Sequence, residues 1–287
     1  MVERTELNRV IYEKDGQVAS IIFNYPEKMN CMDFPGDGGI CDNFYTTALD
    51  MAANDDEVKV VLIKGAGKAF CSGHDLTRVG FVYGMAPGQK ASQQTRLKVD
   101  NHWFAMAFRK LLLFPKITIA VVHGNAIGEG MMITELCDLA VASEDAMFSH
   151  REQRLAFGGQ VPPHCILTYG LKRALDIWIT GRPVYAKEAH EIGLVNKLVS
   201  RDKLDETAKA YADEICNLGR DVIAIGKTAR IQTYSQMGVI AGIDIMGLTH
   251  TLGTNVHWQP DEFNFFKERA KKTAKDGFHG LHEQFKE

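Results

Sequence analysis

Apolar and polar residues in the first quarter of the chain predict strands followed by a helix. Two short strands, Val10 to Glu13 and Gln17 to Phe23, flank Asp15-Gly16, a dipeptide that favours a tight hairpin turn. Apolar residues recur at helical spacing over Ile40 to Ala53, and Val58 to Ile63 is a nearly continuous apolar run. Such a run is typical of a strand that is covered on both faces of its sheet.

The same alternation continues through the middle of the chain. Helices are predicted over Gln93 to Phe114 and Gly130 to Glu135, and strands over Ile117 to Val122 and Asp138 to Ala142. Because strands that alternate with helices form mostly parallel sheets, this order predicts an α/β fold with right-handed crossovers.

Beyond Leu171 the pattern is nearly all helical. The expected helices are Leu204 to Leu218, Val222 to Gln236, residues 239–253 and Asp261 to Lys275. The change of pattern near residue 200 predicts a sheet-containing core over residues 1–200, followed by a C-terminal helical module over residues 201–287.

Composition and charge narrow the class of protein. Of the 287 residues 45% are apolar, and the formal net charge of −3 disfavours a nucleic-acid partner, because phosphate contacts need concentrated Lys and Arg. The first ten residues are rich in charge, and no stretch approaches the roughly 20 apolar residues of a membrane span. We therefore expect no membrane association and a cytoplasmic location. The six cysteines form no CxxC pair, so we expect reduced thiols.

Two glycine-containing loops that follow strands are the strongest candidates for a ligand site. The first spans residues 65–75 and the second spans His123 to Gly130. Their small residues let the backbone approach a ligand, and the second loop leads into a helix N-terminus with its N–H groups and positive dipole end. Neither loop fits a dinucleotide or phosphate-binding pattern, and the histidines form no HExxH zinc motif. Together the loops predict a pair of N–H donors, although either loop alone is equally consistent with a tight turn.

Several segments together resemble the crotonase, or enoyl-CoA hydratase/isomerase, superfamily. They are Pro26 to Asn30, Ala69 to Asp75, Pro115 to Gly128, Cys137 to Ala142 and Leu175 to Gly193. The resemblance runs from Val18 to about Val199. It implies a crotonase-like ββα spiral core with a C-terminal helical trimerisation region, and therefore a homotrimer or hexamer. It also implies an acyl-CoA substrate that carries its own CoA, with no separate cofactor and no metal.

The resemblance further implies roles for individual residues. The backbone N–H groups of Cys71 and Glu129 would form an oxyanion hole for the thioester carbonyl; in other enzymes the loss of one such donor costs about 10²- to 10³-fold in rate. The residues that would contact the substrate are Ser72, Gly73, His74, Asp75, Gly128 and Met132. Glu152 matches one of the two family glutamates and would be the general acid/base.

Met132 stands where the family has its other glutamate, and a methionine cannot transfer protons. Glu129 lies three residues earlier on the same predicted helix face, so its carboxylate is a candidate replacement. The alternative is an exposed glutamate that only interacts favourably with the helix dipole. For Glu152 the alternative is a surface carboxylate paired with Arg151 or Arg154.

Other residues near these loops have two interpretations each. His74 and His150 are either substrate contacts or ordinary polar loop residues. The helical cluster of Trp103, Phe104 and Phe108 belongs either to the core or to an acyl pocket. The segment from Leu76 to Thr95 is expected to be a mobile lid beside the site.

We therefore expect a hydratase- or dehydratase-type lyase that acts on an acyl-CoA. The alternatives are a double-bond isomerase, a carbon–carbon or thioester hydrolase, and a non-catalytic scaffold that binds CoA or RNA. The sequence does not name the acyl group.

Overall fold

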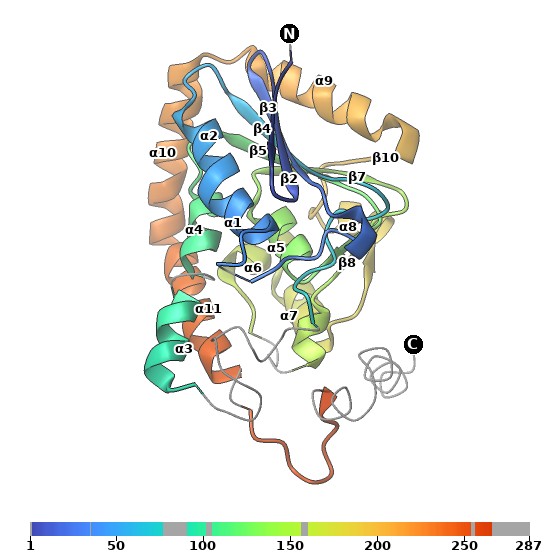
Figure 1. Cartoon of the computed structure of the whole chain (residues 1–287), viewed down its shortest axis with the longest axis vertical. Coiled ribbons are helices and arrows are strands. Elements are labelled where there is room, and N and C mark those ends of the chain that lie inside the picture. The colour runs from blue at the N-terminus through green and yellow to red at the C-terminus, as the bar shows by residue number, and fades with distance from the viewer. Residues whose placement is uncertain are drawn as a thin grey trace.

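A seven-stranded sheet forms the centre of the computed structural model, which describes residues 2–34, 36–76, 91–101, 105–155, 160–253 and 256–265. The strands, in their order across the sheet (Figure 1), are β1 (Glu3–Leu7), β2 (Val10–Asp15), β3 (Val18–Phe23), β4 (Val60–Gly65), β5 (Ile117–Val122), β7 (Leu139–Ser143) and β10 (Lys197–Val199). Strands β1 to β3 pair antiparallel, and all neighbours from β3 to β10 pair in parallel.

A second, three-stranded sheet begins where strands β5 and β7 of the first sheet end. It consists of β6 (Asn125–Ile127), β8 (Met147–Ser149) and β9 (Val184–Tyr185). The chain passes from β5 directly into β6 and from β7 directly into β8, and β6 is parallel to β8. Each of these strand pairs therefore contributes one strand to each sheet. This agrees with the predicted α/β class and its ββα turns.

Helices cover both faces of the large sheet (Figure 1). They are α1 (Ile40–Asp42), α2 (Leu49–Asn54), α3 (Gln93–Asp100), α4 (Met106–Leu112), α5 (Glu129–Leu136), α6 (Pro163–Tyr169), α7 (Leu171–Thr180), α8 (Ala186–Glu191), α9 (Leu204–Cys216), α10 (Arg220–Gln236) and α11 (Val239–Gly253). Short 3-10 turns are η1 (Pro26–Lys28), η4 (Arg151–Arg154) and η5 (Arg201–Lys203), and η2 (Asn43–Ala48) is a π-helical segment between α1 and α2.

The alternation of side chains along the strands divides the interior into two cores. In β4, Val61 and Ile63 belong to the main core, whereas Val60 and Leu62 belong to a second cluster that includes Leu204 of α9. Successive side chains of a strand point to opposite faces, so a strand that is apolar at every position must be covered on both sides. The run from Val58 to Ile63 shows this requirement in the sequence.

Asp138, at the start of β7, anchors α10 to the sheet. Its carboxylate accepts hydrogen bonds from Lys227 Nζ at 2.8 Å, from Arg230 Nη1 at 2.7 Å and from the backbone N–H of Thr118 at 2.9 Å. Burial lowers the pKa of Lys227, although the charge of Asp138 opposes that change. The Cys137-Asp138 pair of the sequence pattern therefore has a structural role in this fold.

Most predicted elements are confirmed, and three differences have clear causes. The helix predicted over Ile40 to Ala53 contains the π-helical η2. The part beyond Leu171, which was predicted to be nearly all helical, also contains the short strands β9 and β10, and β10 extends the large sheet. Helix α9 packs on the sheet, so the second core continues beyond residue 200, while the domain boundary itself stays a prediction.

Several predicted features lie outside the described residues. They are most of the lid (residues 77–90), Trp103 and Phe104, and the greater part of the helix predicted over Asp261 to Lys275. Within the described ranges, no helix has the length and apolar character that crossing a bilayer requires.

Candidate active site

Main-chain hydrogen bonds hold the two glycine-containing loops side by side. Cys71 forms an isolated parallel bridge with Ala126. In this bridge the Cys71 N–H donates to the Asn125 carbonyl at 3.0 Å, and the Cys71 carbonyl accepts from the Ile127 N–H at 2.9 Å. The prediction that the Cys71 N–H is an oxyanion donor is therefore wrong in this structure, because that N–H already pairs with the second loop.

His74, which follows Gly73, carries the N–H that replaces that of Cys71 as the candidate oxyanion donor of the first loop. A second parallel bridge joins His74 to Met32, in which Met32 donates to the Gly73 carbonyl and Asp75 donates to the Met32 carbonyl, both at 2.8 Å. Because the residues on either side of His74 make these bonds, the His74 N–H points to the side away from Met32.

Glu129 carries the candidate N–H donor of the second loop. It is the first residue of α5, and the first N–H groups of a helix have no acceptor within that helix. Gly73 has a φ of 80°, and a Cβ there would lie 2.8 Å from the Ile127 carbonyl oxygen and 3.7 Å from the Gly128 Cα. This close approach requires glycine at 73. Because Gly73 precedes His74 and Gly128 precedes Glu129, the approach also brings the backbones of His74 and Glu129 near each other.

Asn30 fixes the first loop from within the protein. Its side chain is fully buried; the amide Nδ2 donates to the carbonyls of Ala66 and Ala69 at 2.8 Å each, and Oδ1 accepts from the Tyr25 N–H at 2.8 Å. Buried backbone carbonyls need hydrogen-bond donors, so this amide stabilises the turn that precedes Cys71.

Glu152 extends from η4 to the second loop. Its Oε1 accepts a hydrogen bond from His150 Nδ1 at 2.8 Å. Its Oε2 is inaccessible to solvent and has no hydrogen-bond partner within the described part of the chain. A Cβ on Gly128 would lie only 3.2 Å from this oxygen. The unpaired Oε2 therefore lies beside the loop that carries the Glu129 N–H, and the interpretation of Glu152 as a surface carboxylate paired with an arginine does not describe this arrangement.

His150 links Glu152 to a second buried carboxylate. Its Nε2 lies 3.0 Å from Glu135 Oε2, while Glu135 Oε1 accepts from the Tyr169 hydroxyl at 2.7 Å. Burial raises the pKa of Glu135, but the charge of His150 and the hydrogen bonds outweigh burial, so the net change is downward. Glu135 was not predicted from the sequence, although a single carboxylate in the largely apolar segment 130–136 was a usable signal.

Glu129 is buried and paired, contrary to the interpretation of an exposed helix-start glutamate. Its side chain is only 3% exposed, and Oε2 lies 2.8 Å from His74 Nε2. The His74 ring stacks on Phe34 with an interplanar angle of 5°. Burial raises the pKa of the Tyr45 hydroxyl, and the nearby charge of Glu129 raises it further. The Glu129 carboxylate therefore lies in the buried part of the site, next to the His74 ring.

The remaining predicted contact residues have structural partners. The Ser72 N–H donates to the Met29 carbonyl at 3.1 Å, and the Asp75 carboxylate lies 3.6 Å from Lys28 Nζ. Met132 is 4% exposed and belongs to the main core, as does Phe108. Whether these residues contact a substrate stays a prediction.

One group of side chains has donor atoms suited to a metal ion by spacing alone. Donor atoms of Glu135, His164 and Cys165 lie within 4.8 Å of one another. Both Glu135 oxygens already accept hydrogen bonds, and the His150 ring lies 3.0 Å from one of them. A dication there would lie close to that ring, so we assign Glu135 to the hydrogen-bonded network.

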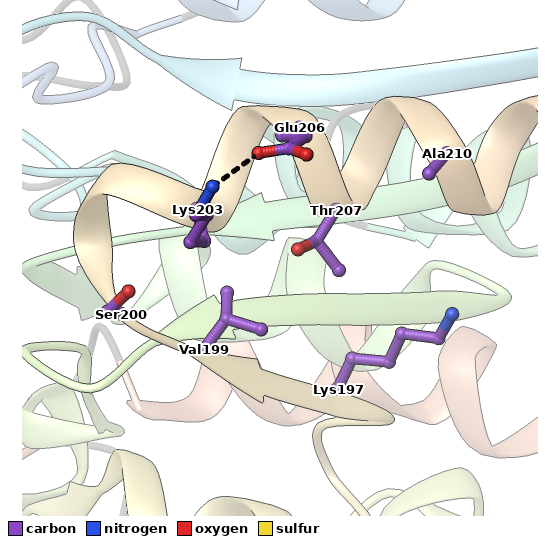
Figure 2. A pocket seen from close by; sticks show the side chains of 7 residues that line it. All are labelled: Lys197, Val199, Ser200, Lys203, Glu206, Thr207 and Ala210. Carbon is purple, nitrogen blue, oxygen red and sulfur yellow. Dashed lines mark hydrogen bonds and ion pairs between the residues drawn. The ribbon is translucent and has the colours of Figure 1, made fainter.

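A surface pocket elsewhere on the molecule is separate from this site. It has a volume of about 470 Å³ and lies between β10 and α9 (Figure 2). Figure 2 shows its lining residues, which are Lys197, Val199, Ser200, Lys203, Glu206, Thr207 and Ala210. The Lys203 ammonium is already paired with Glu206 at 2.9 Å, and none of the candidate residues lines the pocket.

Comparisons with known proteins agree with one another. The family model described as enoyl-CoA hydratase/isomerase matches residues 13–275. The short-chain-enoyl-CoA hydratase of Clostridium acetobutylicum is 32% identical over 233 residues, which cover 78% of this chain and 81% of that protein. The peroxisomal Delta(3,5)-Delta(2,4)-dienoyl-CoA isomerase of Arabidopsis thaliana is 29% identical over 240 residues, covering 80% and 82%. The crystal structure of an enoyl-CoA hydratase/isomerase from Xanthobacter autotrophicus Py2 matches with a TM-score of 0.79 at 26% identity, covering 97% of this chain and 99% of that one.

The ion pair between His74 and Glu129 predicts a pH-dependent contribution to stability. Burial disfavours the charged ring, but the charge and hydrogen bond of Glu129 outweigh burial and raise the pKa of His74 above its ordinary value of 6.5. The contribution is therefore fully present below about pH 6.5 and is lost as the pH rises through the raised pKa. We expect His74→Gln to reduce the free energy of unfolding, measured in urea, more at about pH 6 than at about pH 9.

The Glu129→Gln variant is the control for this prediction. Replacing His74 in that background should give the same loss at both pH values. Equal losses at both pH values in the wild-type background would contradict the ion pair.

Proposed function

The chain belongs to the enoyl-CoA hydratase/isomerase family, and from this premise we propose that it is a lyase that adds water to an enoyl-CoA or removes it from a hydroxyacyl-CoA. The acyl-CoA is the substrate and brings the CoA with it, so we propose no separate cofactor. The observation that carries the proposal is the buried Oε2 of Glu152 beside the second loop, which has no hydrogen-bond partner among the described residues.

We propose that the thioester carbonyl binds between the N–H groups of His74 and Glu129. The paired loops, the direction of the His74 N–H and the position of Glu129 at the start of α5 support this placement. Two N–H donors aimed at the carbonyl oxygen stabilise the negative charge that develops as the thioester becomes enolate-like. Both donors belong to the main chain, so neither depends on the side chain at its position.

Glu152 then transfers the proton at the substrate carbon. A general acid/base must lie within hydrogen-bond reach of the proton that it moves, and Oε2 is the oxygen that has no partner of its own in the described residues. In the hydration direction, the hydroxyl group of the water bonds to the β-carbon and a proton is delivered to the α-carbon, so the net addition is one water.

Glu129 is the candidate for the second carboxylate, which orients the attacking water. It lies one turn before Met132, it is buried, and His74 holds it in place. The backbone of this residue would serve the carbonyl while its side chain serves the water.

A double-bond isomerase is the second candidate, and the apolar Met132 favours it. Isomerisation needs only one base that takes a proton from one carbon and returns it to another. Glu152 alone satisfies that requirement, and the peroxisomal relative from Arabidopsis thaliana is named as an isomerase.

A screen of acyl-CoA thioesters in H₂¹⁸O separates these outcomes by mass spectrometry. Enoyl, hydroxyacyl and cyclic or aromatic acyl-CoAs are incubated with the full chain. A thioester that gains one labelled water identifies hydration, and an isomer of unchanged mass identifies isomerisation. Labelled free acid identifies thioester hydrolysis. If no thioester is converted, the proposed function is wrong and a non-catalytic scaffold replaces it.

We also propose self-association through the C-terminal helices, and a cytoplasmic location. Large apolar side chains on α10 and α11 are 51 to 69% exposed in the single chain: Val222, Ile225, Ile245, Leu248 and Leu252. Exposed apolar side chains that gather on one face mark contact sites between proteins, and Ile245, Leu248 and Leu252 share one face of α11 by their helical spacing. A homotrimer, or two trimers paired into a hexamer, would cover it.

Replacing Glu152 by glutamine should abolish most of the turnover. Glutamine preserves size and hydrogen-bonding atoms but cannot move a proton, and general acid/base catalysis typically contributes about 10²- to 10⁴-fold in rate. We expect kcat to fall within that range while acyl-CoA binding, measured by calorimetry, persists. Turnover close to the wild type would remove Glu152 from its role.

Replacing Glu129 by glutamine should lower kcat by about 10²-fold or more if its carboxylate acts on water, because the side chain loses its basic oxygen. The variant keeps the backbone N–H, so the proposed oxyanion hole is intact. If the carboxylate only favours the helix dipole and the ion pair, stability should change while kcat does not.

A companion Met132→Glu variant restores the family's two glutamates. In the Glu129→Gln background it should recover part of the lost hydration, provided that the added buried charge is tolerated. Full activity of Glu129→Gln alone would instead support the mechanism with a single glutamate.

Light scattering of the purified chain at micromolar concentration should give a trimer or a hexamer. An Ile245→Lys, Leu248→Lys variant places two charges in the exposed apolar patch and should shift the mass toward the monomer. A monomeric wild type would count decisively against the proposed assembly.

A further inference from the structure

His150 lies between two carboxylates in the interior of the protein. Its Nδ1 is 2.8 Å from Glu152 Oε1 and its Nε2 is 3.0 Å from Glu135 Oε2. The side chain is fully buried, and its ring lies over Trp178 with the ring centroids 3.8 Å apart. The ring is therefore fixed by contacts from three other elements, η4, α5 and α7.

Both ring nitrogens of His150 face acceptors. A neutral imidazole has only one N–H, so two hydrogen bonds to two carboxylates require the doubly protonated ring. Burial lowers the pKa of His150, but the charges of Glu135 and Glu152 raise it more, to about 10. A neutral ring would require one of the two carboxyl groups to hold the proton instead.

The groups around this cluster are compatible with a positive ring. The Tyr169 hydroxyl donates to the far oxygen of Glu135, which leaves Oε2 directed at His150. His164 on α6 also faces the cluster, and burial lowers its pKa to about 4, so it is neutral at physiological pH and adds no competing charge.

We infer that His150 is a positioning residue that holds Glu152 by Oε1 and thereby presents Oε2 as the atom that exchanges the proton with the substrate. The inference rests on the proposed function, in which Glu152 is the general acid/base. It assigns separate tasks to the two oxygens of one carboxylate. Glu135 and Tyr169 act indirectly, because their hydrogen bonds fix the His150 ring rather than Glu152 itself.

The physical gain is orientation. A glutamate side chain has three rotatable bonds, and a hydrogen bond to one carboxylate oxygen limits the directions in which the other oxygen can point. A displacement of about 1 Å in a reacting group can cost about 10²-fold in rate. The N–H of Gly128 donates to the Ser149 carbonyl at 2.8 Å, so the same stretch of chain that carries His150 also fixes the second loop. The adjacent residues Ser149 and His150 therefore fix the positions of the Glu129 N–H and of Glu152 Oε2 relative to each other.

Two variants of His150 separate positioning from a merely structural role. The amide nitrogen of asparagine lies near the position of Nδ1, and that of glutamine lies near the position of Nε2. His150→Asn can therefore still donate to Glu152, whereas His150→Gln can donate only to Glu135. Both variants lose the charge and one of the two hydrogen bonds, so each is the control for the other.

We expect His150→Gln to lower kcat by about 10²-fold with little change in KM, and His150→Asn to stay within about tenfold of the wild type. Melting temperatures are measured for both variants, and we expect similar decreases because each loses one bond to the network. Equal losses of kcat in the two variants would overturn the inference.

A second measurement does not depend on activity. NMR of histidine-selectively ¹⁵N-labelled protein should show His150 with both nitrogens protonated up to about pH 8, and Glu135→Gln should lower the pH at which the proton is lost. A His150 ring that carries no proton on Nδ1 at pH 7 overturns the inference even in an active enzyme. If the NMR result is as expected but no acyl-CoA is converted, the proposed function has failed and the bridging geometry has not.

Discussion

The candidate site depends on a short stretch of main-chain pairing between two loops that are more than 50 residues apart. Through the bridge between Cys71 and Ala126, the end of the first loop is fixed against the strand that leads into α5. The fit is tight, because a Cβ on Gly130 would lie 2.4 Å from the Cys71 carbonyl oxygen. The contact between Gly130 and the Cys71 carbonyl therefore fixes how far the start of α5 lies from the first loop. The relative position of the two proposed N–H donors follows from that contact.

The sequence was sufficient for the local elements and for the loops, but not for their pairing. Strands such as Ile117 to Val122 were predictable because buried parallel strands are apolar at nearly every position. The three-residue β10 was not, because so short a strand has no detectable period. The N–H of Cys71 was a reasonable donor until the register of the loops was known. Which N–H takes part in a bridge depends on contacts between segments that are distant in sequence. Because the Cys71 N–H donates to the Asn125 carbonyl, the candidate donor moves from Cys71 to His74.

The same limit applies to the charged residues. Glu152 could be found from its position in a pattern, whereas the partners that bind its Oε1 and fix the ring of His150 come from other elements. Around Met132, the helix carries Glu129 three residues before and Glu135 three residues after. These two carboxylates have different partners, a loop histidine for Glu129 and a buried histidine–tyrosine pair for Glu135. Met132 thus lies between two carboxylates that each pair with a histidine, Glu129 with His74 and Glu135 with His150. Neither pairing was predicted from the sequence.

Placing the proposed donors in the backbone has an evolutionary consequence. A substitution at position 74 or 129 changes the side chain but leaves the N–H where the fold puts it, so the ability to stabilise an enolate-like charge would survive the mutation. The side chains at such positions can therefore change one at a time while the main-chain donors stay in place. His74 and Glu129 would then be an example, in which the side chains nearest the thioester carbonyl diverged while the backbone N–H donors were retained.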